Sequence, residues 1–165
     1  MSGLHRNAEK IQQLLRELGG DNEVVQLSES TRSAAEAATA LGVEPAQIAK
    51  SIIFLTRSET GEERSVLVVA SGRHRICKKK LRTILGSKPR QANAEAVKRF
   101  TGFPIGGVPP LGHHLEPITL IDESLAGYEV LWAAAGTPFT VFRTTFDQLV
   151  QWTGGQVSDV REDET

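Results

Sequence analysis

Residues 101–112, TGFPIGGVPPLG, hold four glycines and three prolines, and we call this segment the Gly/Pro loop. Glycine permits a positive φ and a close backbone approach, whereas proline fixes φ and removes an N–H donor. A loop of this kind holds its remaining amides at defined positions, where they can bind a carbonyl oxygen or a developing oxyanion. The pattern matches neither a Walker loop nor GxGxxG. A purely structural turn is the alternative, and composition does not separate the two.

Lys50 stands directly before the apolar, β-branched run SIIFLT of residues 51–56, which predicts a buried strand. A lysine at this place either extends its stem along the apolar surface toward water or points into a cleft. In a cleft, its ammonium would act as a point charge for a phosphate. Both interpretations stay open from this residue alone.

Positive charge is concentrated in residues 71–100, which hold ten Lys or Arg residues and one acid, although the net charge of the chain is −1. Such a stretch is expected where one face meets a polyanion, and it would bind a phosphate backbone without reading its sequence. A solvated face, or pairing with the acidic C-terminal third, is the alternative. No aromatic residue interleaves with the candidate cations, so base stacking on them is not expected. They are Arg73, Arg75, Lys78, Lys79, Lys80 and Arg82.

Other chemistries have little support. His113 and His114 are adjacent, so their side chains diverge, and without HxH, HExxH or CxxC no metal site is expected. His113 follows the Gly/Pro loop and is expected to line the same pocket. Cys77 lies among cations that favour a thiolate, which leaves a thiol-dependent hydrolase open, but no histidine and carboxylate pair accompanies it. No GxSxG elbow occurs.

Local patterns predict the elements that position these residues. Apolar spacing predicts a helix from Leu4 to Leu18, and a basic amphipathic helix covers residues 78–85. Ser33 and Thr144 have capping-box spacing for helices over 34–41 and 146–152, and Asn93 caps one over 94–100. Strands are expected over residues 24–27, 51–56, 65–70, 118–121, 129–135, 139–143 and 156–160, the second and third forming a hairpin. The fold class is α/β or mixed α+β, with one mixed, twisted sheet flanked by helices.

The 165 residues, 39% hydrophobic and 24% charged, predict a single soluble domain. We expect an N-terminal helix packed on it at 1–21, the domain proper at 22–160 and a solvated acidic tail at 161–165. No apolar run reaches the roughly 18 residues of a membrane span, and no secretory signal pattern opens the chain. One cysteine allows no internal disulfide, so a cytoplasmic location is expected.

Several segments, taken in order, resemble the YbaK/ProX-type aminoacyl-tRNA deacylases, a family that includes the editing domain inserted in many bacterial prolyl-tRNA synthetases. The resemblance covers residues 22–157. The most specific marks are the lysine within AKSIIF and the Gly/Pro loop. The matching segments are STRSAAEAATALGV, PAQIAKSIIFL, VLVVASG, KKLRTILG, TGFPIGGVPPLG and AAAGTPFTVF.

The resemblance implies hydrolysis of the ester that joins a wrong amino acid to tRNA, with no cofactor. Lys50 would contact the terminal nucleotide, and Gly106, Gly107 and Val108 would shape the aminoacyl pocket through their backbone. Some relatives carry a histidine at the position of Phe139, so its replacement bears on substrate preference. The remaining residues expected at the substrate are Ser30, Thr31, Ser51, Ser71, Pro109, His113, Gly136, Thr137, Pro138 and Phe139.

The implied partner is aminoacyl-tRNA, bound through its acceptor stem and 3′ end, with an aminoacyl-tRNA synthetase as a second partner left open. Neither a membrane nor DNA is expected, since no recognition-helix motif occurs. The main alternative is a non-catalytic tRNA- or synthetase-binding module of the same fold. Such a module would keep the basic stretch but need not keep Lys50 and the loop glycines, all of which this chain has.

Overall fold

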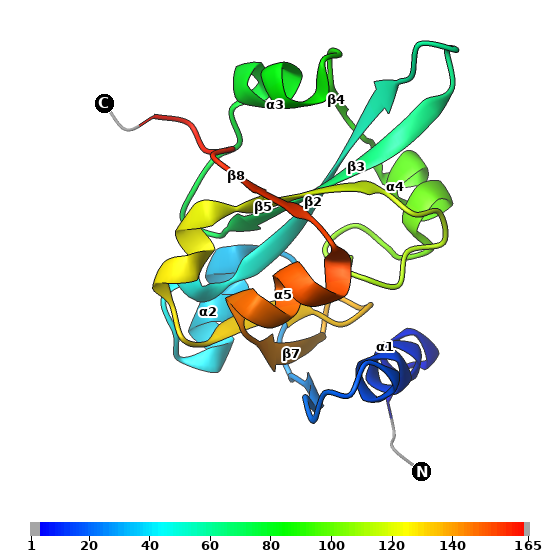
Figure 1. Ribbon diagram of the computed structural model, residues 1–165. Coiled ribbons are helices and arrows are strands. Elements are labelled where there is room, and N and C mark those ends of the chain that lie inside the picture. The colour runs from blue at the N-terminus through cyan, green and yellow to red at the C-terminus, as the bar shows by residue number, and fades with distance from the viewer. Residues whose placement is uncertain (1–3, 164–165) are drawn as a thin grey trace.

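The structure, a computed structural model, describes residues 4–163, and its strands lie in two sheets (Figure 1). The larger, mixed sheet is formed by β2 (Ala49–Arg57), β3 (Glu63–Ser71), β4 (Arg90–Gln91), β5 (Ile118–Asp122) and β8 (Gln156–Ser158), in the order β4-β2-β3-β5-β8. The smaller, antiparallel sheet is formed by β1 (Val24–Gln26), β6 (Leu131–Ala134) and β7 (Thr140–Thr144), in the order β1-β7-β6.

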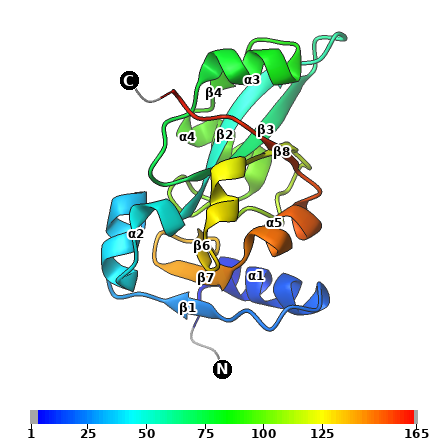
Figure 2. The ribbon, with the colours of Figure 1, turned by 60° about the vertical axis from the view of Figure 1, so that its left-hand side comes forward.

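Helices cover both faces of the larger sheet (Figure 2). They are α1 (Arg6–Glu17), α2 (Ala34–Leu41), α3 (Lys78–Leu85), α4 (Ala94–Thr101) and α5 (Phe146–Thr153), with 3-10 turns η1 (Pro45–Gln47) and η2 (Glu123–Gly127). The main core joins one face of this sheet to α1, α4, α5 and the smaller sheet, while α3 packs on the other face. Within residues 4–163, no helix has both the length and the apolar character needed to cross a membrane.

The predicted hairpin is confirmed: β2 and β3 are antiparallel and pair from Ala49 with Ser71 to Arg57 with Glu63. Successive side chains of a strand point to opposite faces of the sheet. On β3, Leu67 therefore belongs to the main core, and its neighbour Val68 belongs to the cluster under α3. Because both faces are buried, the register of this hairpin is strongly specified.

The helix starts agree with the capping signals at two of three places. Ser33 accepts a hydrogen bond from the backbone of Glu36, and Asn93 caps α4 in the same way. The cap of α5 is wrong by one residue: Thr145, rather than Thr144, accepts from the Gln148 backbone. Thr144 is still paired in β7, so its backbone is extended before the helix begins.

The α/β fold class is confirmed, but the expectation of one sheet is too simple. The two sheets are linked by an isolated parallel bridge between Ile48 and Trp132. Strand patterns in the sequence predict which residues are extended, whereas the partner of a strand depends on contacts far apart in the chain. The division into two sheets matters because it leaves space between β2 and β6.

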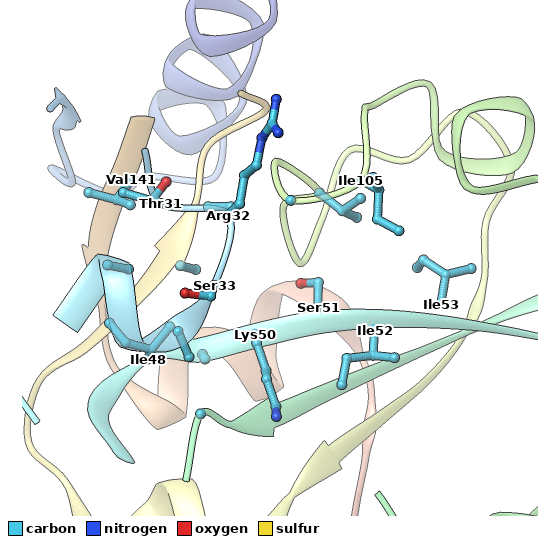
Figure 3. A pocket seen from close by; sticks show the side chains of 18 of the residues that line it. Thr31, Arg32, Ser33, Ile48, Lys50, Ser51, Ile52, Ile53, Ile105 and Val141 are labelled. Atoms are coloured by element: carbon cyan, nitrogen blue, oxygen red, sulfur yellow. The ribbon is translucent and has the colours of Figure 1, made fainter. Parts of the chain in front are cut away.

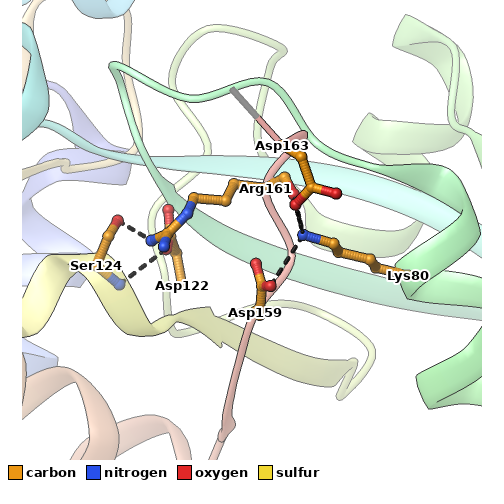
Figure 4. Close-up of polar contacts among 6 residues, drawn as sticks. All are labelled: Lys80, Asp122, Ser124, Asp159, Arg161 and Asp163. Carbon is orange, nitrogen blue, oxygen red and sulfur yellow. Dashed lines mark hydrogen bonds and ion pairs between the residues drawn. The ribbon is translucent and has the colours of Figure 1, made fainter. Parts of the chain in front are cut away.

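The C-terminal segment is held against the body of the protein (Figure 4). Arg161 forms a bridge with Ile76, and the Glu162 amide donates to the Arg75 carbonyl at 2.8 Å. Glu162 and Asp163 are exposed, as expected for a solvated tail, but the segment 161–163 is attached to the body of the protein through these bonds and through Lys80. Residues 164–165 lie outside the described range.

Candidate functional site

A cavity of about 490 Å³ lies between β2, β6, the start of α2 and the Gly/Pro loop (Figure 3). Much of its wall is apolar, including Ile53, Val97, Val108 and Trp132. A concave, mostly apolar site with a few polar groups is the usual form of a small-molecule binding site. The polar or charged residues at its wall are Thr31, Arg32, Ser33, Lys50, Ser51 and Gln91.

Five of the expected site residues line this cavity, although they come from three separate segments of the chain. They are Thr31, Lys50, Ser51, Gly106 and Val108. The other expected pocket residues are not part of the cavity wall. They are Ser30, Ser71, Gly107, Pro109, His113, Gly136, Thr137, Pro138 and Phe139.

Lys50 contributes to the cavity wall, but its side chain leaves β2 on the side opposite to Ser51 (Figure 3). Its Nζ donates a hydrogen bond to the carbonyl of His74 at 2.7 Å. Burial lowers the pKa of Lys50, the Asp122 carboxylate opposes that shift, and Arg75 adds to it. An ammonium has three N–H donors, so the bond to His74 leaves two for another acceptor.

Ser51 places a hydroxyl on the side of β2 that faces the Gly/Pro loop (Figure 3). Its Oγ is buried and has no hydrogen-bond partner within the described structure. A buried hydroxyl without a partner carries a desolvation cost that a ligand can relieve. Of the polar side chains on this wall, that of Ser51 would therefore gain most from a hydrogen bond to a ligand.

Two residues of the Gly/Pro loop that border the cavity have backbone amides without an internal acceptor. Gly106 and Val108 line the wall, and their N–H groups donate to no other residue among 4–163. The Gly107 N–H is already used, since it donates to the Pro104 carbonyl at 2.9 Å and closes a turn. The amides of Gly106 and Val108, rather than that of Gly107, are therefore the ones in this loop that remain free to bind an oxygen atom of a ligand.

The segment 136–139 supports this loop from behind. Thr31 is buried, and its hydroxyl donates to the Pro138 carbonyl at 2.8 Å. The Gly136 carbonyl accepts from the side chain of Asn7 in α1 at 3.1 Å. Thr137 is buried against Thr140, and Phe139 stays 42% exposed. This segment therefore joins α1, the start of α2 and the Gly/Pro loop.

The remaining expected pocket residues make internal hydrogen bonds. Ser71 donates through its hydroxyl to the Ala46 carbonyl and through its amide to Asp122. Ser30 accepts from the Arg32 amide at 3.3 Å. His113 donates through Nε2 to the Pro109 carbonyl at 2.7 Å, and burial lowers the pKa of His113.

The expected cations lie on and before α3, on the side of the larger sheet to which Lys50 points. Arg73, Arg75, Lys78, Lys79 and Arg82 are exposed. Lys80 differs, because its Nζ lies 2.9 Å from Asp159 and 2.8 Å from Asp163 (Figure 4). Hydrogen bonds to these carboxylates raise the pKa of Lys80. At this one position, the alternative of pairing with the acidic C-terminal third is confirmed.

Arg32 lines the cavity but was not among the expected site residues. The signal that could have found it is its place between the pocket residue Thr31 and the N-cap Ser33, since such a position is fixed on both sides. Among residues 4–163, no group of three His, Cys, Asp or Glu side chains could hold a metal ion.

The sequence matches the aminoacyl-tRNA editing domain family over residues 28–152. It is 31% identical over 137 residues to the uncharacterized protein YwhH of Bacillus subtilis (strain 168), covering 83% of this chain and 85% of that protein. It is also 32% identical over 93 residues to a proline–tRNA ligase of Limosilactobacillus fermentum (strain NBRC 3956 / LMG 18251), covering 56% of this chain and 16% of the ligase.

Solved structures agree with this match. One is described as a candidate trans-editing enzyme for prolyl tRNA synthetase; it is 42% identical, has a TM-score of 0.88 and is covered over its full length by 98% of this chain. Another, the hypothetical protein APE2540, is 29% identical with a TM-score of 0.84, covering 93% of this chain and 99% of that one. The chain therefore belongs to the aminoacyl-tRNA editing domain family and is a YbaK-type editing domain.

Proposed function

We propose that the protein is a trans-editing enzyme that deacylates mischarged aminoacyl-tRNA. The observation that carries the proposal is the cavity between β2 and the Gly/Pro loop, which combines an apolar wall with two available amides, those of Gly106 and Val108. The cavity lies within the segment that matches the editing domain family. The mostly apolar wall favours an uncharged aminoacyl side chain.

The reaction is hydrolysis of an ester that is already activated. Water attacks the carbonyl carbon, the bond from that carbon to the ribose oxygen breaks, and the free amino acid and a tRNA with an intact hydroxyl result. The enzyme then needs positioning and charge stabilisation more than a strong nucleophile. The amides of Gly106 and Val108 would hold the carbonyl oxygen as negative charge develops, and one such donor is worth about 3 kcal/mol. The neighbouring ribose hydroxyl or the substrate amine would orient the water.

Lys50 would bind the terminal nucleotide from the side of the loop that follows β3. Its ammonium keeps two N–H donors beyond the bond to the His74 carbonyl, and a phosphate or ribose oxygen would accept them. Gly72, the first residue after β3, also lines the cavity, so the cavity extends to the start of the loop that carries His74.

The acceptor stem would lie along the basic segment before and on α3. Its exposed cations would neutralise backbone phosphates, so affinity should fall steeply as salt rises. The family match to a proline–tRNA ligase makes a synthetase the second partner to test.

The test is a deacylation assay over a panel of mischarged tRNAs, with the wild type beside Lys50→Ala and Lys79→Ala. Rapid release of one amino acid, lost in Lys50→Ala and retained in Lys79→Ala at saturating tRNA, would support the enzyme and name the substrate. Equal rates for Lys50→Ala and the wild type would refute the role of Lys50. No release from any tRNA, with binding still measurable at low salt, would favour the non-catalytic module.

A further inference from the structure

We propose that Arg32 is a phosphate-binding residue at the rim of the cavity, where it binds the backbone of the single-stranded 3′ end of the tRNA as that strand leaves the site. This inference rests on the proposed function for the identity of the strand. It adds a positioning residue outside the basic segment of α3 and on the other side of β2 from the Lys50 amine.

The backbone at Arg32 is fixed on both sides. Thr31, which precedes it, is buried and donates through its hydroxyl to the Pro138 carbonyl at 2.8 Å. Ser33, which follows it, is the N-cap of α2 and accepts from the Glu36 amide at 3.1 Å. The Arg32 amide itself donates to Ser30. An arginine on such a backbone has its Cα, and so the start of its side chain, at a fixed position.

The stem of Arg32 packs against the Gly/Pro loop. Gly106 has φ of +85°, and a Cβ built on it would lie 3.0 Å from Cγ and 3.3 Å from Cα of Arg32. The loop and the stem are therefore in contact, and a side chain at position 106 would displace one of them. Gly106 therefore both lines the cavity and packs against the stem of this cation.

The guanidinium has no partner in the described part of the chain. It forms neither an ion pair nor a hydrogen bond with any residue among 4–163, and the residue is exposed. Lys80 shows the contrast, since Asp159 and Asp163 neutralise its charge. An arginine left unpaired at a fixed place, with five N–H donors in a planar fork, suits an external phosphate.

The direction of the Arg32 side chain decides whether it would bind a backbone phosphate or a group inside the cavity. Figure 3 shows the Arg32 side chain extending away from Ser33 and Ser51, beside the loop that carries Ile105. A guanidinium so placed points away from an aminoacyl group bound at Ser51. It meets instead the part of the ligand that lies outside the mouth, and in an aminoacyl-tRNA this is the phosphodiester chain.

The experiment compares Arg32→Ala with a matched control, Arg64→Ala. Arg64 is exposed, forms no ion pair among the described residues and does not line the cavity, so Arg64→Ala removes the same charge without changing the cavity wall. The first readout is binding of an uncharged RNA minihelix ending in CCA, followed by fluorescence anisotropy over a salt series. This readout does not depend on catalysis.

We expect Arg32→Ala to weaken minihelix binding about five- to tenfold, with Arg64→Ala within about twofold of the wild type. The slope of log affinity against log salt should fall by about 1 for Arg32→Ala, and Arg32→Lys should recover part of the loss. Equal affinities for Arg32→Ala and Arg64→Ala would overturn the proposal.

The second readout uses two substrates that carry the same amino acid. On aminoacyl-minihelix, Arg32→Ala should raise KM and leave kcat close to the wild-type value. On aminoacyl-adenosine, which has no phosphate, it should change neither. Equal losses on both substrates would overturn the phosphate role and assign Arg32 to the pocket itself. If the wild type hydrolyses neither substrate, the proposed function fails, and the minihelix affinities still decide the role of Arg32.

Discussion

Gly107 packs directly on the backbone of Thr137: a Cβ built on Gly107 would lie 2.7 Å from the Thr137 carbonyl carbon and 2.8 Å from its Cα. Such contacts are too short for any side chain, and the neighbouring atoms are backbone that cannot turn away. We expect Gly107→Ala to cost about 1–3 kcal/mol of unfolding free energy and to move the adjacent amides. Urea unfolding measures the first effect, and loss of deacylation measures the second.

Gly127→Ala is the control for this change. No atom lies within 4 Å of a Cβ built on Gly127, and its φ is not positive. We expect the free energy of unfolding of Gly127→Ala to stay within about 0.5 kcal/mol of the wild-type value. Equal effects of the two alanine variants would show that the contact with Thr137 does not restrict position 107.

Ser51→Ala should separate stability from substrate binding. The Ser51 hydroxyl is buried without a partner, so its removal breaks no hydrogen bond in the free protein. We expect unfolding free energy to change by less than about 0.5 kcal/mol, or to rise slightly. KM for the edited aminoacyl-tRNA should increase several-fold because the hydroxyl faces the cavity. A stability loss with unchanged KM would contradict this role.

Lys79 and Lys80 are adjacent on α3 and should differ in their effect on tRNA affinity. Lys79 is exposed, whereas the charge of Lys80 is neutralised by Asp159 and Asp163. We expect Lys79→Ala to weaken tRNA binding at low salt, and to do so more than Lys80→Ala. Filter binding over a salt series measures both affinities, and a reversed order would contradict the prediction.

Lys80→Ala should instead loosen the C-terminal segment. Its Nζ also donates to the Arg161 carbonyl at 2.7 Å, so the variant loses three contacts to residues 159–163. Faster hydrogen exchange at the Glu162 amide, which donates to Arg75, is the expected signature. Unchanged exchange would mean that the backbone bonds hold the segment alone.

His113 should make stability depend on pH. Burial lowers the pKa of His113 below its ordinary value of 6.5, and its bond to Pro109 opposes this only in part. The unfolded chain therefore takes up a proton before the folded protein does, so stability falls as pH decreases below about 6.5 and levels off below the folded-state pKa. A second proton on the ring would sit at the buried Nδ1, which has no partner among the described residues.

The measurement is the urea midpoint of the wild type and His113→Gln at pH 7.5 and 5.5. Glutamine does not titrate, so the urea midpoint of His113→Gln should decline less from pH 7.5 to pH 5.5 than that of the wild type. A decline of equal size in both proteins would assign the effect to other groups.

Local residue types predicted most of the elements, and five of the residues expected at the substrate line the cavity. Ser33 and Asn93 fix helix starts through hydrogen bonds within four residues, and such signals are legible in a sequence. The cap at Thr145 was missed because two adjacent threonines both have a polar residue three positions later, and only the pairing of Thr144 in β7 decides between them.

What sequence reasoning could not supply is the assembly of distant segments. Neither the division of the strands into two sheets nor the contact between Arg32 and Gly106 has a local signal. The opposite directions of the Lys50 and Ser51 side chains could have been predicted, because side chains alternate along any strand. Both residues nonetheless border the same cavity as the Gly/Pro loop.

The pairing of β2 with β3 carries a consequence for insertions and deletions. Removing one residue between positions 49 and 57 would shift every later side chain to the other face, placing apolar groups of the core under α3. The turn at 58–62, at the far end of the hairpin, has no such restriction, since its length can change while the nine pairs stay in place. Length variation among natural homologues should therefore gather in this turn and be absent from the strand.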